Sequence, residues 1–284
     1  MNIYLSGSNG LVGTAVKKAF EAEGHSVTGL GRDFSKPLDF QGVDAVIHLA
    51  GENIAEGRWN AAKKARIKDS RLIGTRKLAE QLAQSEHKPS VFISASATGF
   101  YGDTGSETIT ETSAAGTGFL PEVCVEWEAS TQPAEEAGIR TVHLRTGIVM
   151  SKKGGALKKM LPPFLLGGGG ILGTGNQYMS WITLADMVGA IRFAMENDSL
   201  SGPVNLTAPN PVDNKEFTKI LGRVIKRPTI APLPGFAAKL IFGEMADAIL
   251  LSGTKVLPTK LTEAGYSFTH ATLEPALQDV MNEK

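Results

Sequence analysis

Residues 6–13 read SGSNGLVG, after a predicted strand at 2–7 and before a segment of helical periodicity. Gly7, Gly10 and Gly13 form the pattern G-x-x-G-x-x-G at this strand-to-helix junction. The first glycine permits a tight turn, the second lets a pyrophosphate approach the backbone, and the third allows close packing of helix on strand. The N-terminus of the helix then faces the anion. The pattern predicts a βα unit that binds a dinucleotide.

The first half of the chain alternates short apolar runs with amphipathic stretches, which is typical of a parallel sheet built from βα units. Further strands are predicted at 26–31, 44–51, 90–96 and 141–150, and helices at 11–23, 60–84 and 119–137. The connection RDFSKPLDFQGV (32–43) has little room for a helix and a strand, so we expect an abbreviated crossover there. The predicted fold class is α/β, a Rossmann-type doubly wound parallel sheet.

A second region is predicted after Met150. The stretch PPFLLGGGGILGTGNQYMSW (162–181) is loop-like and is expected to lie over a cleft. A helix at 183–197 and a strand at 203–209 are predicted next, and from about 212 helices alternate with proline-rich turns. We therefore expect a dinucleotide-binding domain at 1–151, completed by 181–209. Residues 152–180 and 210–284 would form a smaller, mainly helical substrate lobe.

The composition limits the classes of function. The chain has 284 residues with 29 Lys+Arg and 29 Asp+Glu, and this balance does not favour a nucleic-acid partner. No apolar run approaches the ~20 residues that span a bilayer, and the start lacks the features of a signal peptide, so no membrane partner is expected. Cys124 is the single cysteine, which fits a cytoplasmic protein, and the five histidines lack zinc-ligand spacing, so no metal is expected.

The choice of dinucleotide depends on the end of the second strand. An acid there would accept the ribose 2′-hydroxyl of NAD, whereas an arginine would accommodate the 2′-phosphate of NADP. Arg32 follows the strand directly, and Asp33 is the rival at the usual spacing for a ribose acid. We favour Arg32, and therefore NADP over NAD. The predicted cofactor contacts are Gly7, Ser8, Asn9, Gly10, Leu11, Val12, Gly13, Arg32, Leu49, Ala50, Gly51 and Ser94.

Several motifs together resemble the extended short-chain dehydrogenase/reductase superfamily. They are the glycine pattern, HLAG (48–51), and a serine strand followed by YGD (101–103). Over nearly its full length the chain is similar to an atypical branch named for nucleoside-diphosphate-sugar epimerases, with a C-terminal domain of unknown function. The similar stretches include ENIAEGRW (52–59) and GPVNLTAP (202–209). The resemblance implies the Rossmann fold, a nicotinamide cofactor and epimerase or oxidoreductase chemistry.

The resemblance also implies a Tyr-x-x-x-Lys pair that moves a proton, at the start of the helix that follows YGD. In this chain those positions are Phe119 and Val123, and neither side chain exchanges a proton. Tyr101 is the earlier, non-catalytic tyrosine of the pattern. Ser96 matches the superfamily's catalytic serine, with one extra residue before YGD. Glu122, on the helix that lost the pair, is the candidate replacement acid or base.

The predicted substrate contacts are Arg58, Trp59, Tyr101, Arg145, Gln177 and Trp181. Arginine forks suit phosphates or carboxylates, and tryptophan offers a flat stacking surface. The expected substrate is a small molecule that carries a phosphate or resembles a nucleotide sugar. Three functions stay open: an NADP-dependent epimerase or oxidoreductase, a non-catalytic NADP(H)-binding sensor, and an interaction protein with a vestigial site. The oligomeric state stays open; the resemblance implies that a homodimer, if one forms, would pair through the helices at 60–84 and 119–137, where relatives often pair.

Overall fold

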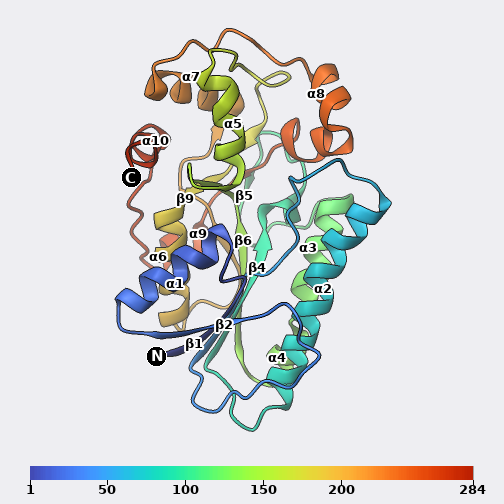
Figure 1. Ribbon diagram of the computed structural model, residues 1–284, viewed down its shortest axis with the longest axis vertical. Helices are drawn as coiled ribbons and strands as arrows, with labels where there is room; N and C mark the ends of the chain where they lie inside the picture. The colour runs from blue at the N-terminus through green and yellow to red at the C-terminus, as the bar shows by residue number, and fades with distance from the viewer. Residues whose placement is uncertain (284) are drawn as a thin grey trace.

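The computed structural model describes residues 1–283, and its centre is a six-stranded parallel sheet of order β10-β6-β4-β3-β1-β2 (Figure 1). This arrangement confirms the predicted α/β, Rossmann-type fold. The strands are β1 (Asn2–Ser6), β2 (Ser26–Leu30), β3 (Ala45–His48), β4 (Val91–Ala97), β6 (Arg140–Thr146) and β10 (Gly202–Leu206).

Helices cover both faces of the sheet, so its strands are buried on both sides. One face carries α1 (Leu11–Ala22) and α6 (Leu184–Glu196), and the other carries α2 (Ala61–Gln84), α3 (Phe119–Ala129) and α4 (Gln132–Glu136) (Figure 1). Strand residues alternate between two apolar clusters. Ile47 and Ile93 join the cluster under α1 and α6, whereas Val46 and Phe92 join the cluster under α2.

The crossover between β2 and β3 is abbreviated, as the sequence predicts. Residues 31–44 contain no helix or strand and lead directly from the edge strand to β3, the other neighbour of β1. The register pairs Ser6 with both Leu30 and His48. The loops that follow β1, β2 and β3 therefore leave the sheet side by side at its carboxyl edge.

Most of the remaining elements form the smaller helical region in the upper part of Figure 1, with a core that includes Trp181, Phe217 and Leu277. Its helices are α5 (Gly155–Leu165), α7 (Asn214–Ile225), α8 (Gly235–Phe242) and α10 (Leu273–Asn282), and α9 (Thr259–Glu263) lies against β10. Short ribbons pair β5 (Thr108–Ile109) with β12 (Lys255–Val256), β7 (Ile148–Met150) with β9 (Trp181–Thr183), and β8 (Tyr178–Met179) with β11 (Val212–Asp213). The single turns are η1 (Thr98–Tyr101) and η2 (Ala246–Leu250).

Two predicted elements are each divided into two. The strand expected at 141–150 stops at Gly147, where a Cβ would lie 2.4 Å from the Ser180 carbonyl oxygen, and continues as β7 in a separate ribbon. The helix expected at 119–137 is broken between α3 and α4. There Ser130 and Thr131 donate their hydroxyls to the carbonyls of Glu126 and Glu128, which competes with helical bonding.

The stretch predicted as a loop over a cleft begins as a helix. Pro162 and Pro163 lie inside α5, and the irregular chain starts only after Leu165. The apolar face formed by Leu157, Leu161 and Phe164 is buried in the core of the smaller region. This burial outweighs the helix-breaking tendency of the prolines.

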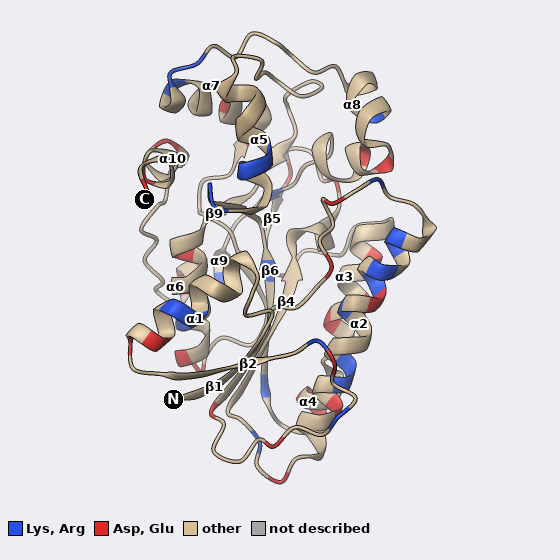
Figure 2. Cartoon of the chain, viewed as in Figure 1, with Lys and Arg blue, Asp and Glu red and all other residues tan. Residues whose placement is uncertain are grey.

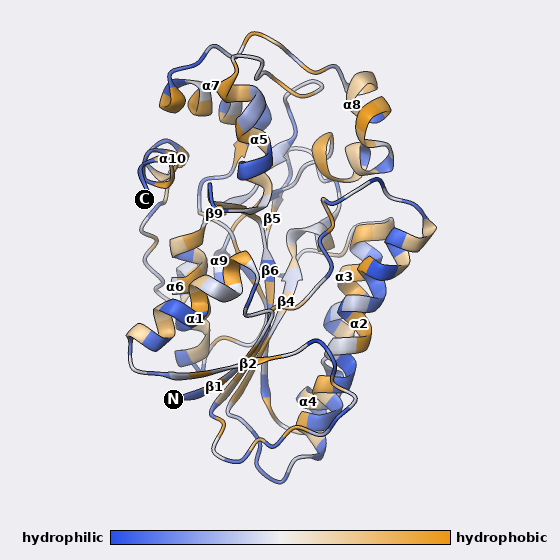
Figure 3. Cartoon of the chain, viewed as in Figure 1, coloured by the Kyte–Doolittle hydropathy of each residue, from blue (hydrophilic) through white to orange (hydrophobic). Residues whose placement is uncertain are grey.

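Charge and hydropathy vary over the surface. Figure 2 shows basic residues along α2 and acidic residues on the adjoining α3, and Lys68 Nζ lies 2.7 Å from Glu126 Oε1. Figure 3 shows an apolar α8, on which Phe236 and Leu240 are exposed. Among residues 1–283, no helix combines the length and the apolar character that a membrane crossing requires.

Candidate functional site

The glycine-rich turn ends β1 and begins α1 with an uncapped helix N-terminus. Gly7 has a φ of +72°, a conformation that side chains with a Cβ rarely adopt. Gly10 is the N-cap residue, no side chain caps the helix, and its first turn holds no acidic residue. The first N–H groups of an α-helix have no partner within the helix, and the helix dipole favours an anion there. The turn therefore offers backbone donors to a phosphate.

Two of the three glycines are required by packing. A Cβ on Gly7 would lie 2.8 Å from the Leu49 carbonyl carbon, and one on Gly13 would lie 2.1 Å from the Gly7 oxygen. A Cβ on Gly10 would meet only the Gly7 oxygen, at 3.3 Å. Gly7 thus joins the turn to the chain after β3, and Gly13 holds α1 close to the turn. Gly10 is left as the exposed glycine at which a ligand can approach.

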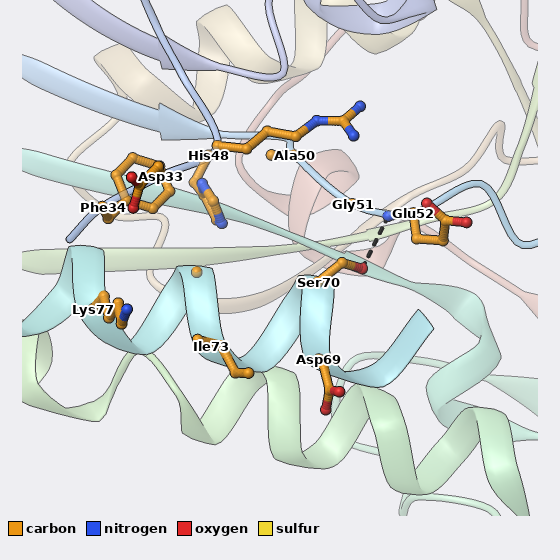
Figure 4. Close-up of a pocket in the computed structure, with 12 residues that line it drawn as sticks. Asp33, Phe34, His48, Ala50, Gly51, Glu52, Asp69, Ser70, Ile73 and Lys77 are labelled. Carbon is orange, nitrogen blue, oxygen red and sulfur yellow. Dashed lines mark hydrogen bonds between the residues drawn. The ribbon is translucent and has the colours of Figure 1, made fainter. Parts of the chain in front are cut away.

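A pocket of about 300 Å³ lies between the sheet edge and α2 (Figure 4), and its lining residue Ala50 lies against the turn, with the Ala50 amide nitrogen 2.9 Å from a Cβ built on Gly7. Three segments line it. The chain after β2 contributes Arg32, Asp33 and Phe34; the end of β3 and the chain after it contribute His48, Ala50, Gly51 and Glu52; and α2 contributes Asp69, Ser70, Ile73, Gly74 and Lys77. The structure thus brings together Arg32, Ala50 and Gly51 of the predicted cofactor contacts.

The cations and acids of this pocket are in different environments. A hydrogen bond from Ser35 lowers the pKa of the Asp33 carboxyl, which accepts from the Ser35 amide at 2.9 Å. The hydrogen bond from Lys63 similarly lowers the pKa of Glu52. Within residues 1–283, neither Arg32 nor Lys77 forms a salt bridge. Asp33 and Glu52 are thus held by neighbouring groups, whereas Arg32, Lys77 and the exposed Asp69 of α2 form no salt bridge within residues 1–283, and the two cations remain available to an anion.

His48 lies at the back of the pocket and is 1% exposed. Its Nδ1 is 2.6 Å from Ser6 Oγ, and its ring meets the edge of Phe34 with the centroids 5.6 Å apart. Its Nε2 is buried and has no hydrogen-bond partner among the described residues. Burial lowers the pKa of His48 to about 4, so the imidazole is neutral at pH 7.

This buried histidine predicts a pH-dependent stability. The unfolded chain takes up a proton on His48 below about pH 6.5, whereas the folded chain resists protonation until about pH 4. The stabilisation is complete above pH 6.5, and about 3 kcal/mol is lost as the pH falls toward 4. Urea unfolding of wild type and His48→Gln across this range is the measurement. The variant should show the shallower decline, and equal slopes would contradict the assignment.

A second polar cluster lies under α3, at the carboxyl ends of β4 and β6. Ser96 donates to Glu128 Oε1 at 2.6 Å. Arg145 holds the same carboxylate with two bonds of 2.8 Å, from Nε to Oε1 and from Nη2 to Oε2. Arg145 Nη1 donates to the Tyr101 hydroxyl at 3.0 Å, and that hydroxyl donates to Asn205 Oδ1 at 2.7 Å. The cluster joins β4, β6, β10 and α3.

The position of Tyr101 excludes a role as proton donor in this geometry. The residue is 2% exposed, and its hydroxyl is already bonded by Arg145 and Asn205. Burial raises the pKa of this hydroxyl above its usual value. Neither Tyr101 nor Arg145, which is 4% exposed, lines the pocket. Their polar atoms stabilise the cluster, and the expectation that both contact substrate stays a prediction.

The other predicted substrate contacts are also held by the protein itself. Arg58 is exposed and donates to the Leu240 carbonyl of α8 at 2.8 Å, while buried Trp59 donates to the Ile54 carbonyl. Gln177 donates to the carbonyls of Leu172 and Leu250, and Trp181, fully buried, donates to the carbonyl of Asn210. Their polar atoms bond the protein itself in this structure, and the expected substrate contacts of Arg58, Trp59, Gln177 and Trp181 stay predictions.

The helix that lacks the tyrosine–lysine pair begins at Phe119. Phe119 packs against Trp59 with the centroids 5.4 Å apart, and Val123 is buried. Glu122 is exposed in the first turn, where a carboxylate stabilises the helix dipole. Glu128, another of the three glutamates on this helix, accepts a hydrogen bond from Ser96. The catalytic roles of Ser96 and Glu122 stay predictions.

The pocket residues on α2 were missed by the sequence analysis. Ser70, Ile73, Gly74 and Lys77 lie at spacings i, i+3, i+4 and i+7, which place side chains on one helical face. That stripe was a detectable signal, because it includes a glycine and an exposed isoleucine in the middle of a helix. Phe34 carried no such signal, since its role depends on the irregular crossover.

Comparisons with known proteins agree along the whole chain. A model described as the NAD dependent epimerase/dehydratase family matches residues 3–206, and one described as a domain of unknown function, DUF1731, matches 233–280. An epimerase family protein of Mycobacterium tuberculosis is 43% identical over 97% of this chain and 96% of its own length. The crystal structure of human epimerase family protein SDR39U1 with NADPH covers 100% of both chains with a TM-score of 0.94 and 30% identity. A nucleoside-diphosphate sugar epimerase from Corynebacterium glutamicum covers 99% of this chain and 58% of its own, with a TM-score of 0.80 and 34% identity.

Proposed function

This chain belongs to the NAD dependent epimerase/dehydratase family, and we propose that it binds NADP(H) and acts as an epimerase or oxidoreductase on a nucleotide-sugar-like substrate. The observation that carries the proposal is the uncapped N-terminus of α1 beside a pocket with two available cations. The turn at Gly7–Gly13 would bind the diphosphate. The chain at Leu49–Gly51 would lie against the adjoining ribose, and the pocket would take the adenosine end.

The residues present fit a dinucleotide on three grounds. A Cβ at Gly10 would meet only the Gly7 oxygen, at 3.3 Å, and Gly10 is exposed, so a ligand can approach the backbone there. Small residues, Ala50 and Gly51, line the pocket, and the buried Nε2 of His48 has no partner among the described residues. The bound nicotinamide would supply the hydride chemistry, and the protein would supply binding and orientation.

The preference for NADP rests on the charges around the pocket. Arg32 and Lys77 are exposed cations at its rim, Asp33 at the end of the second strand is engaged by Ser35, and the remaining unengaged acid, Asp69, lies on α2 away from that strand end. A 2′-phosphate favours such cations, and a ribose 2′-hydroxyl would instead favour a free acid. The human relative was crystallised with NADPH, which agrees with this preference.

Arg32→Ala should lower the affinity for NADPH by about 10-fold or more and barely change that for NADH, since only NADPH carries the phosphate. Calorimetric titration of both reduced cofactors measures this difference. Arg66→Ala is the matched control, because Arg66 Nε lies 3.8 Å from Glu52 but Arg66 does not line the pocket. Equal losses for NADPH and NADH would contradict 2′-phosphate recognition by Arg32, and an absence of binding by wild type would overturn the proposed function.

A second function is favoured by one observation. Phe119 and Val123 replace the tyrosine and lysine, and the bonded Tyr101 does not compensate for them. A cofactor-binding sensor without turnover would have this site. Nucleotide sugars added to the cofactor-loaded protein distinguish the two functions: a change in nicotinamide absorbance or an epimerised product supports an enzyme, and binding without either supports a sensor. The homodimer through α2 and α3 stays a prediction.

A further inference from the structure

His48 is the least explained buried polar group near the pocket. Its Nε2 lacks a partner among residues 1–283, although a buried donor or acceptor without a hydrogen bond costs about 1–3 kcal/mol. Figure 4 shows the imidazole beside Phe34 and extending toward α2. A buried ring nitrogen without a partner in a pocket indicates that a bound ligand supplies its hydrogen bond.

The hydrogen bond to Ser6 determines what His48 presents to the pocket. Ser6 is fully buried, and the only side-chain bond of its hydroxyl within residues 1–283 is to His48 Nδ1. If Nδ1 carried the proton, the Ser6 hydroxyl hydrogen would be left without an acceptor. The arrangement that satisfies both groups has Ser6 donating to Nδ1, and the neutral ring then carries its proton on Nε2.

The surroundings of this N–H leave room for an occupant. Gly74 lies within α2, where glycine costs about 1 kcal/mol relative to alanine. A Cβ at this position would meet only Phe34, at an ordinary contact of 3.7 Å. Packing in the protein alone therefore does not require glycine here, whereas a ligand in the pocket that Gly74 lines would benefit from the missing side chain.

We propose that His48 Nε2–H is a specificity-determining donor for the adenosine half of the dinucleotide, and that Ser6 is the positioning residue that fixes its tautomer. The inference rests on the proposed cofactor binding. The recognised atom is an acceptor, either a ring nitrogen of the base or an oxygen of the ribose. Arg32 discriminates by charge at the rim, and His48 discriminates by a neutral hydrogen bond at the back of the same pocket.

The test is calorimetric titration of wild type and variants with NADPH, adenosine 2′,5′-bisphosphate and nicotinamide mononucleotide. His48→Met should lower the affinity for the first two ligands by about 5- to 10-fold, as expected for one neutral hydrogen bond, and leave the third unchanged. His48→Gln, which retains an N–H donor, should recover part of the loss. Ser6→Ala should weaken binding, because without the Ser6 hydroxyl the His48 proton is shared between the two ring nitrogens. Ser6→Ala/His48→Met should bind no worse than His48→Met.

Melting temperatures distinguish a role of His48 in ligand recognition from a purely structural role. The double variant removes both polar groups, so its ligand-free melting temperature should stay within a few degrees of wild type or rise. Side-chain ¹⁵N spectra, assigned with His48→Gln, should show the Nε2–H tautomer in wild type and a mixture in Ser6→Ala. Unchanged affinity of His48→Met with a lowered melting temperature would overturn the His48 inference alone. A wild type that binds neither NADPH nor the bisphosphate would overturn the proposed function as well.

Discussion

Gly13→Ala is expected to abolish dinucleotide binding and to lower the free energy of unfolding by about 3 kcal/mol or more. The new methyl group would lie 2.1 Å from the Gly7 carbonyl oxygen and 2.9 Å from Ser8 Cα. Both neighbours are backbone atoms, so no side-chain rotation relieves the overlap. Either α1 moves away from β1 or the turn opens, and each movement displaces the N–H groups that would bind the diphosphate. Urea unfolding and NADPH titration measure the two effects.

Gly10→Ala is the matched control within the same turn. Its methyl group would lie 3.3 Å from the Gly7 oxygen, and Gly10 has a φ of −79°, which alanine adopts readily. Stability should therefore change by less than about 1 kcal/mol, while NADPH affinity falls because the methyl group occupies the approach of the ligand. If Gly13→Ala melted and bound NADPH like wild type, the assigned role of α1 packing would be wrong.

These two glycines also show what the sequence could and could not predict. The spacing of Gly7, Gly10 and Gly13 predicted the turn, the strand before it, the helix after it and a dinucleotide as the ligand. It could do so because the requirement for glycine is local to one strand–turn–helix unit. The alternation of apolar runs likewise predicted the sheet. The breaks at Gly147 and at Ser130–Thr131 were not predicted, since the first depends on contact with Ser180 and the second on competing side-chain bonds.

The substrate-site predictions stay predictions, because residue type alone does not distinguish a ligand contact from an internal one. Arginine, tyrosine and tryptophan suit ligand binding, but they also satisfy buried carbonyls and carboxylates of the protein itself. Arg145 and Tyr101 were assigned to substrate by residue type, and only the tertiary structure reveals that Glu128 and Asn205 occupy them. Conversely, the HLAG motif did not single out His48 as a ligand contact. Its free Nε2 became visible only when burial and the Ser6 bond were known.

Arg145→Met should destabilise the protein by about 3–5 kcal/mol, the cost of leaving a buried carboxylate without its cation. The Glu128 side chain is 12% exposed. Without Arg145 it would keep the hydrogen bond from the Ser96 hydroxyl, and outside the cluster the His143 ring, whose Nδ1 lies 4.0 Å away. The Tyr101 hydroxyl would also lose a donor, although it keeps Asn205. Arg145→Lys keeps the charge but not the two parallel bonds, so it should lose less.

Two further variants test whether the loss of stability comes from breaking the Arg145–Glu128 ion pair. Arg145→Met/Glu128→Leu removes both charges and should recover much of the stability, because a buried pair costs desolvation as well as providing attraction. Tyr101→Phe removes only the hydroxyl and should cost about 1–3 kcal/mol by leaving Asn205 Oδ1 without its donor. NADPH affinity at a temperature where each variant is folded should stay near the wild-type value, since the cluster does not line the pocket. If Tyr101→Phe or Arg145→Lys selectively lost affinity or turnover while remaining stable, the cluster would contact ligand, and the assignment of its polar atoms to the protein would be incorrect.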